Sequence, residues 1–148
     1  MTPLVEGPGI IRDDVASGRG VVGGVHLEWS VACNVGRVRE ANEDGAVARA
    51  GVFLIADGMG GHDCGEIASE IALTVLSGVE AGGGQTETRD ELEQLFVAAQ
   101  DEIGEIDTSS ERRAGTTLTG AILVEHDKTP HWLVANIGDR SEEHTSEL

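Results

Sequence analysis

The stretch that decides the fold runs Gly51-Val52-Phe53-Leu54-Ile55-Ala56-Asp57-Gly58-Met59-Gly60-Gly61-His62. Its first half is a short, continuous apolar run, and this length with a glycine-rich exit favours a buried strand over a helix. Glycines follow Asp57 at 58, 60 and 61, and glycine permits positive φ and close backbone approach. We therefore expect a strand that ends in a tight turn carrying a rigidly held carboxylate.

The segments around this strand predict grouped strands and grouped helices. Strand patterns occupy 25–33, 51–56, 115–124 and 131–137. Helical periodicity covers 65–80 and about 88–106. The order β, β, α, α, β, β favours an α+β fold with an antiparallel sheet over a doubly wound fold. Residues 1–24, rich in glycine and without a clear period, are expected to form a flexible leader.

The apolar stripes of both helices are expected to be core faces. In the first helix, Ile67, Ile71, Val75 and Val79 recur every four residues, with Ala68, Ala72 and Leu76 beside them. The second stripe comprises Leu92, Leu95, Phe96, Ala99, Ile103 and Ile106.

Composition limits the class of protein. The 148 residues fit one domain, and 39% hydrophobic with 3% aromatic residues predicts an aliphatic core. A net charge of −17 argues against nucleic acid and anionic membranes as partners. No apolar run reaches the roughly 20 residues that span a bilayer. Cys33 and Cys64 form no CxxC pattern, and no signal peptide is visible, so a cytoplasmic location is expected.

The last nine residues, 140–148, differ in character from the rest. They read Arg-Ser-Glu-Glu-His-Thr-Ser-Glu-Leu, which matches the translation of a common sequencing adapter. We interpret them as an artefact joined to a truncated reading frame and exclude them from the fold. The alternative is a genuine polar terminus.

Three charged clusters occur where the chain turns: 39–44, 57–62 and 138–139. Separated carboxylates and a glycine carbonyl suit hard cations such as Mg²⁺ and Mn²⁺ better than zinc. Arg39 offers a bidentate fork for phosphate oxygens. Each feature alone has an ordinary reading, since an Asp before Gly is usually a turn residue. A nucleotide-binding loop is disfavoured because neither GxxxxGK[ST] nor GxGxxG is present.

Five motifs in order resemble the PPM-type (type 2C) protein phosphatases, particularly the bacterial branch. They are Val38-Arg39-Glu40-Ala41-Asn42-Glu43-Asp44, Ile55 to His62, Gly65-Glu66-Ile67-Ala68-Ser69, Gly115-Thr116-Thr117-Leu118 and Asn136-Ile137-Gly138-Asp139. The resemblance spans about 25–139. It implies an antiparallel β-sandwich flanked by helices, which hydrolyses phosphoserine and phosphothreonine in proteins with metal-activated water.

The resemblance also implies residue roles. Asp57 would bridge two Mg²⁺ or Mn²⁺ ions, the Gly58 carbonyl would bind one, and Glu43 and Asp44 would act mainly through bound waters. Arg39 corresponds to the phosphate-binding arginine, and Asp139 would help hold a third, weaker metal. His62 lies near the general acid proposed in some members, and a structural role is the alternative.

The family pattern continues beyond Asp139 with Ser-Arg and with two further metal-binding aspartates, which this chain lacks. The chain is therefore expected to be an incomplete domain whose C-terminal half is missing, with little activity of its own. Its partners would be phosphorylated proteins. The alternative function is a non-catalytic pseudophosphatase that binds phosphoproteins.

Overall fold

A central antiparallel sheet organises the structure, a computed structural model that describes residues 9–34, 42–60, 64–106 and 114–138. Its long strands, in spatial order, are β3 (Asp44–Arg49), β4 (Val52–Met59), β7 (Leu118–His126) and β8 (Thr129–Ile137). Two short strands extend it: β6 (Gly115–Thr116) pairs antiparallel with β4, and β5 (Gly83–Gly84) pairs parallel with β7. The predicted α+β class is confirmed.

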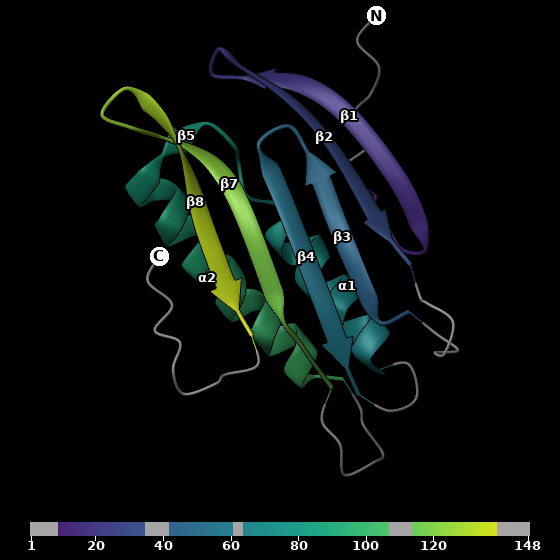
Figure 1. Ribbon diagram of the computed structural model, residues 1–148. Coiled ribbons are helices and arrows are strands. Elements are labelled where there is room, and N and C mark those ends of the chain that lie inside the picture. Colours follow the sequence, from purple (N-terminus) through teal and green to yellow (C-terminus); the bar gives the residue numbers. More distant parts are fainter. Residues whose placement is uncertain (1–8, 35–41, 61–63, 107–113, 139–148) are drawn as a thin grey trace, which may run out of the picture.

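Two helices cover one face of this sheet, α1 (Cys64–Leu76) and α2 (Gln85–Gly104) (Figure 1). Alternate residues of β4 point toward them, because side chains alternate between the faces of a strand. The core between helices and sheet is aliphatic, as composition predicts, and includes Val47, Val52, Leu54, Leu73, Leu76, Leu92, Ile122 and Val124. Neither helix is both long and apolar enough to cross a membrane, over the residues described.

The predicted core stripe of the first helix is largely confirmed. Ala68, Ala72, Leu76 and Val79 are buried, and Val75 packs against the core. The distance between packed elements depends on the side chains at the contact, so alanines let the helix lie close to the sheet. Ile67 alone is 44% exposed, so its assignment to the core was wrong.

The C-terminal end of α1 is closed by Arg49 of β3. The Arg49 guanidinium donates hydrogen bonds to the carbonyls of Ser77, at 2.9 Å, and Val79. A cation at this end also interacts favourably with the helix dipole. Burial lowers the pKa of Arg49, although Glu80 and Glu91 oppose the shift. The contact lies just beyond Leu76, where α1 ends, short of the predicted residue 80.

A β-hairpin begins within the segment that was predicted to be a flexible leader. β1 (Asp14–Val22) pairs antiparallel with β2 (Val25–Cys33) along its whole length, so the interpretation of 1–24 as a leader is wrong for 14–22. Gly23 and Gly24 form a two-residue turn with φ of 54° and 79°, the conformation that matches strand twist.

The sequence did not predict β1, because glycines interrupt the alternation of side chains that is typical of a strand. A Cβ on Gly18 would lie 2.6 Å from the Trp29 ring, so the indole of β2 occupies the place of a β1 side chain. Strand β2 itself matches its predicted limits, and Val25, Leu27, Trp29 and Val31 share its more buried side.

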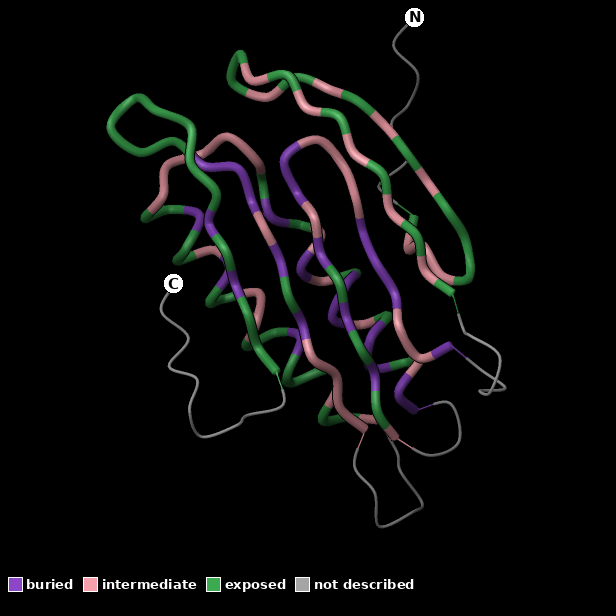
Figure 2. Tube along the Cα trace, viewed as in Figure 1, coloured by how far each residue is buried: buried purple, intermediate pink, exposed green. Residues whose placement is uncertain are grey.

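The hairpin packs on the face of the main sheet opposite the helices. Trp29 contacts Phe53 edge-on, with ring centroids 5.6 Å apart, and Phe53 contacts Trp132 at 5.8 Å. The two sheets form the expected sandwich, but the second has only two strands. Beyond the hairpin, Ile55 and Val134 remain 59% and 54% exposed, so part of this apolar face is uncovered (Figure 2).

Candidate functional site

Two carboxylates face each other across the adjoining ends of β3 and β4. Asp44 lies directly opposite Asp57 in the antiparallel register. The neighbouring pair is hydrogen-bonded, since the Gly58 N–H donates to the Glu43 carbonyl at 3.1 Å. Asp44 and Asp57 therefore form a non-hydrogen-bonded pair, in which facing side chains come closest. The register thus brings together two predicted site residues 13 positions apart in the sequence.

Glycines let α1 begin directly against this strand end. A Cβ on Gly58 would collide with the Gly65 carbonyl and lie 2.8 Å from the Glu43 carbonyl oxygen. A Cβ on Gly65 would collide in turn with Glu43 Oε2. The two glycines therefore bring the acidic segment, the end of β4 and the first turn of α1 into contact.

Glu43 adds a third carboxylate near this strand end, on the side of the sheet that faces α1. Its Oε2 atom is buried and has no hydrogen-bond partner among the described residues. A buried, unpaired carboxylate oxygen is costly unless a donor or a cation compensates it. Its position against Gly65, in the first turn of α1, is electrostatically favourable for an anion.

The backbone of Asp57 is fixed from the other side by Thr117. The Thr117 N–H donates to the Asp57 carbonyl at 2.9 Å, and the Asp57 N–H donates to Thr117 Oγ1 at 3.2 Å. No hydrogen bond to the Asp57 carboxylate is formed by the described residues, and the side chain is exposed. Asp57 is thus rigid in its main chain and available through its side chain.

The turn after Asp57 needs glycine at position 60. Gly60 has φ of 146°, and a Cβ there would lie 3.1 Å from Cys64 Cβ and 3.3 Å from Ala114 Cα. Side chains rarely adopt this backbone conformation, and a Cβ would also make tight contacts with these neighbours. The glycine-rich exit predicted from the sequence therefore has a steric cause.

Three predicted site residues, Arg39, His62 and Asp139, lie outside the described residues. Gly138, which precedes Asp139, approaches Thr117, since a Cβ on it would lie 3.8 Å from Thr117 Cγ2. Within the described part of the chain, no three Asp, Glu, His or Cys side chains are arranged to hold a metal ion.

Sequence reasoning missed two polar residues that support the acidic segment. Asn42, 6% exposed, accepts a hydrogen bond at Oδ1 from the Asp44 N–H at 3.0 Å. Arg12 donates to the Asn42 carbonyl at 2.7 Å. Asn42 belonged to a quoted motif but received no role, and Arg12 lies 30 residues away, so no sequence pattern links them.

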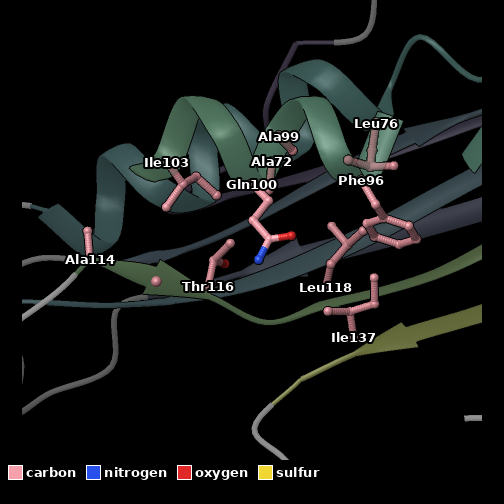
Figure 3. Close-up of a pocket in the computed structure, with 11 residues that line it drawn as sticks. Ala72, Leu76, Phe96, Ala99, Gln100, Ile103, Ala114, Thr116, Leu118 and Ile137 are labelled. Carbon is pink, nitrogen blue, oxygen red and sulfur yellow. The ribbon is translucent and has the colours of Figure 1, made fainter. Parts of the chain in front are cut away.

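A separate cavity of about 330 Å³ lies between the helices and the sheet (Figure 3). It is lined by Leu76, Phe96, Gln100, Ile103, Leu118 and Ile137, among others. Its polar side chains are Gln100 and Thr116, and no carboxylate lines it. The cavity therefore lacks the charged ligands that metal or phosphate chemistry requires.

Comparison with known proteins agrees with this architecture. The chain is 34% identical over 119 residues to the serine/threonine phosphatase stp of Listeria monocytogenes, covering 70% of this chain and 44% of that protein. Its fold is similar to that of the PPM Ser-Thr phosphatase MsPP of Mycobacterium smegmatis, with a TM-score of 0.54, 29% identity and coverage of 85% and 45%. The serine/threonine phosphatase PstP/Ppp of Mycobacterium tuberculosis gives a TM-score of 0.58, 27% identity and coverage of 85% and 46%.

No family model matches the chain. Sequence and fold nevertheless agree on the same class, a bacterial serine/threonine phosphatase domain. The chain is similar in sequence to bacterial serine/threonine phosphatases and in fold to a PPM-type phosphatase. It spans about half the length of the relatives that it matches, at 44% to 46%.

Proposed function

We propose that the protein to which this chain belongs hydrolyses phosphoserine and phosphothreonine in proteins, with two Mg²⁺ or Mn²⁺ ions. The observation that carries the proposal is the apposition of Asp44 and Asp57. Glu43, at the same strand end, adds a buried Oε2 that has no hydrogen-bond partner among the described residues. The names of the relatives support the reaction class.

The residues present fit a hard divalent cation. Like charges directly opposite each other in a sheet are destabilising, so Asp44 and Asp57 gain from a cation between them. A cation would also compensate Glu43 Oε2, which lacks a hydrogen-bond partner among the described residues. The candidate ligands are all oxygens, which Mg²⁺ and Mn²⁺ prefer.

Each residue has a distinct role in this proposal. Asp57 would be the ligand shared by the two cations, the Gly58 carbonyl would be a ligand of one of them, and Glu43 and Asp44 would hold them mainly through waters. When bound, the cations would lower the pKa of water and neutralise charge on the phosphoryl oxygens. The rigid main chain at Asp57 keeps its carboxylate in place for this task.

Residues outside the described part complete the proposal. Arg39 binds phosphate oxygens through its planar fork. Asp139 contributes to a third, weaker metal site. His62 donates a proton to the leaving group or serves the structure, and the two roles predict different effects of His62→Gln on the pH profile.

The chain by itself is expected to have little activity. It spans less than half of the relatives' length, and its described residues bring no three side-chain ligands together. The expected partners are phosphorylated proteins. The cytoplasmic location stays a prediction, with which Cys33 and Cys64 agree because they form no disulfide bond.

The test uses the complete protein encoded around this chain, assayed on a phosphothreonine peptide with Mn²⁺. Activity should depend on the metal, and Asp57→Asn should lower kcat roughly 10²-fold or more. Glu125→Gln, at an exposed strand position opposite Pro130, is the matched control. An inactive complete protein that still captures the phosphopeptide would instead support a pseudophosphatase.

A further inference from the structure

A partly buried polar contact links the segment before the hairpin to the acidic segment and to α1. Arg12 donates hydrogen bonds to the Asn42 carbonyl at 2.7 Å and to Ser69 Oγ at 3.0 Å, with a longer contact to the Glu66 carbonyl at 3.4 Å. Ser69 is fully buried on α1. One guanidinium therefore joins three parts of the chain that meet at the candidate site.

The main chain holds Arg12 in this position. Ile11 and Ala46 exchange two backbone hydrogen bonds, of 2.8 and 3.0 Å, which fasten the segment to the edge of β3. A Cβ on Gly45 would lie 3.4 Å from Arg12 Nη2 and 2.8 Å from Leu73 Cδ1. The bare backbone of Gly45, next to Asp44, thus leaves room for the guanidinium.

Asn42 receives support from its side chain as well. Its Nδ2 donates to Asp13 Oδ1 at 2.9 Å, and its Oδ1 accepts from the Asp44 N–H. Arg12 holds the carbonyl of the same residue. Because Glu43 lies between these fixed points, the direction of its side chain depends on both contacts.

We propose that Arg12 is a positioning residue that holds Asn42, Glu43 and Asp44 against α1, in the geometry that a divalent cation requires. The inference rests on the proposed function, because it assigns the geometry a role in metal binding. The hydrogen bonds of Arg12 go to protein carbonyl and hydroxyl oxygens, so its role is separate from phosphate binding by Arg39. Partners that orient metal ligands typically change metal affinity 10–100-fold when removed.

The test measures Mn²⁺ binding to the whole chain by electron paramagnetic resonance of the free ion, up to millimolar concentrations. Arg12→Gln should raise the Kd about tenfold or more. Arg19→Gln, the same change at an exposed position of the hairpin, should leave it unchanged. Arg12→Lys keeps the charge but loses the planar guanidinium, so its Kd should lie between those of the Arg12→Gln and Arg19→Gln variants. Unfolding in EDTA is measured in parallel.

Equal Mn²⁺ affinity of the folded Arg12→Gln and Arg19→Gln variants would overturn the inference and leave Arg12 a purely structural clamp. If Arg12→Gln does not fold, Arg12→Lys decides, and wild-type affinity in that variant would overturn the inference. The Asp57→Asn variant distinguishes failure of the proposed metal site from failure of the role assigned to Arg12. If wild-type binding does not depend on Asp57, the proposed metal site fails and this inference with it; if it does, only the role of Arg12 is in question.

Discussion

Replacing Asp57 with asparagine is expected to stabilise the chain without metal and to remove its stabilisation by Mn²⁺. Asp57 faces Asp44 directly, and its carboxylate accepts no hydrogen bond from a described residue. Asparagine preserves the shape and removes one of the two like charges. The substitution should therefore relieve repulsion while it deletes the proposed bridging ligand.

The size of this stabilisation follows from the strand register, which sets the distance between the two carboxylates. Facing side chains in such a pair are roughly 5 Å apart, and two unit charges at that distance in water interact by about 0.8 kcal/mol. Since Asp57 is exposed, screening keeps the gain near this lower limit, at about 0.5–1 kcal/mol. That corresponds to a rise in Tm of about 2–4 °C.

Mn²⁺ should reverse the order of stability of the wild-type chain and the Asp57→Asn variant. At a Mn²⁺ concentration ten times its Kd, the wild-type chain gains about 1.4 kcal/mol from binding, and the variant gains little of it. The assay is thermal unfolding followed by circular dichroism, with EDTA and then with increasing Mn²⁺. Glu125→Gln, which faces Pro130, is the control and should respond to Mn²⁺ as the wild type does.

Two results would refute this reasoning. A lower Tm of Asp57→Asn in EDTA would mean that the carboxylate stabilises the fold, against the repulsion inferred from the register. An equal rise of Tm with Mn²⁺ in both proteins would mean that the ion binds the acidic surface diffusely.

Three further substitutions test the architecture. Arg49→Ala should lower the free energy of unfolding by about 1–3 kcal/mol in urea, because carbonyls at the end of α1 lose their donor. Gly58→Ala should lower it by about 1–3 kcal/mol or more, since its methyl group would collide with the Gly65 carbonyl; an unchanged midpoint would contradict the close contact. Val134→Lys should raise solubility without loss of stability, and more than Val97→Lys on α2, because Val134 belongs to the uncovered sheet face.

Sequence patterns predicted the elements whose periodicity is strong. Strand β2, the strand ending at Asp57, both helices and the β7–β8 hairpin all have apolar residues at regular spacing. The patterns missed β1 and β3. In β1, Gly18 lies against the Trp29 ring. Because glycine has no side chain, this contact leaves no apolar residue in the sequence of β1 that a strand pattern could include. The Gly23-Gly24 pair was the available signal, as a two-residue hairpin turn.

The sequence likewise predicted one part of the candidate site and not another. The identity of its carboxylates could be predicted, because the turn glycines and acidic residues are adjacent in the sequence. Their grouping depends on strand register, which pairs Asp44 with Asp57 and brings Glu43 against Gly65. Arg12 could not be predicted, since its partners lie 30, 54 and 57 residues away.

The amino-acid sequence by itself therefore determined which residue types meet these places: carboxylates at strand ends, glycines at the sharp turn and aliphatic residues in the core. These are local properties of residue type and spacing. Only the tertiary structure decided that Ile67 stays exposed, that Asp44 faces Asp57, and that Arg12 contacts the segment before them. Such features depend on register and on close packing between distant segments, and a one-residue shift in register would separate the carboxylates without changing any local pattern.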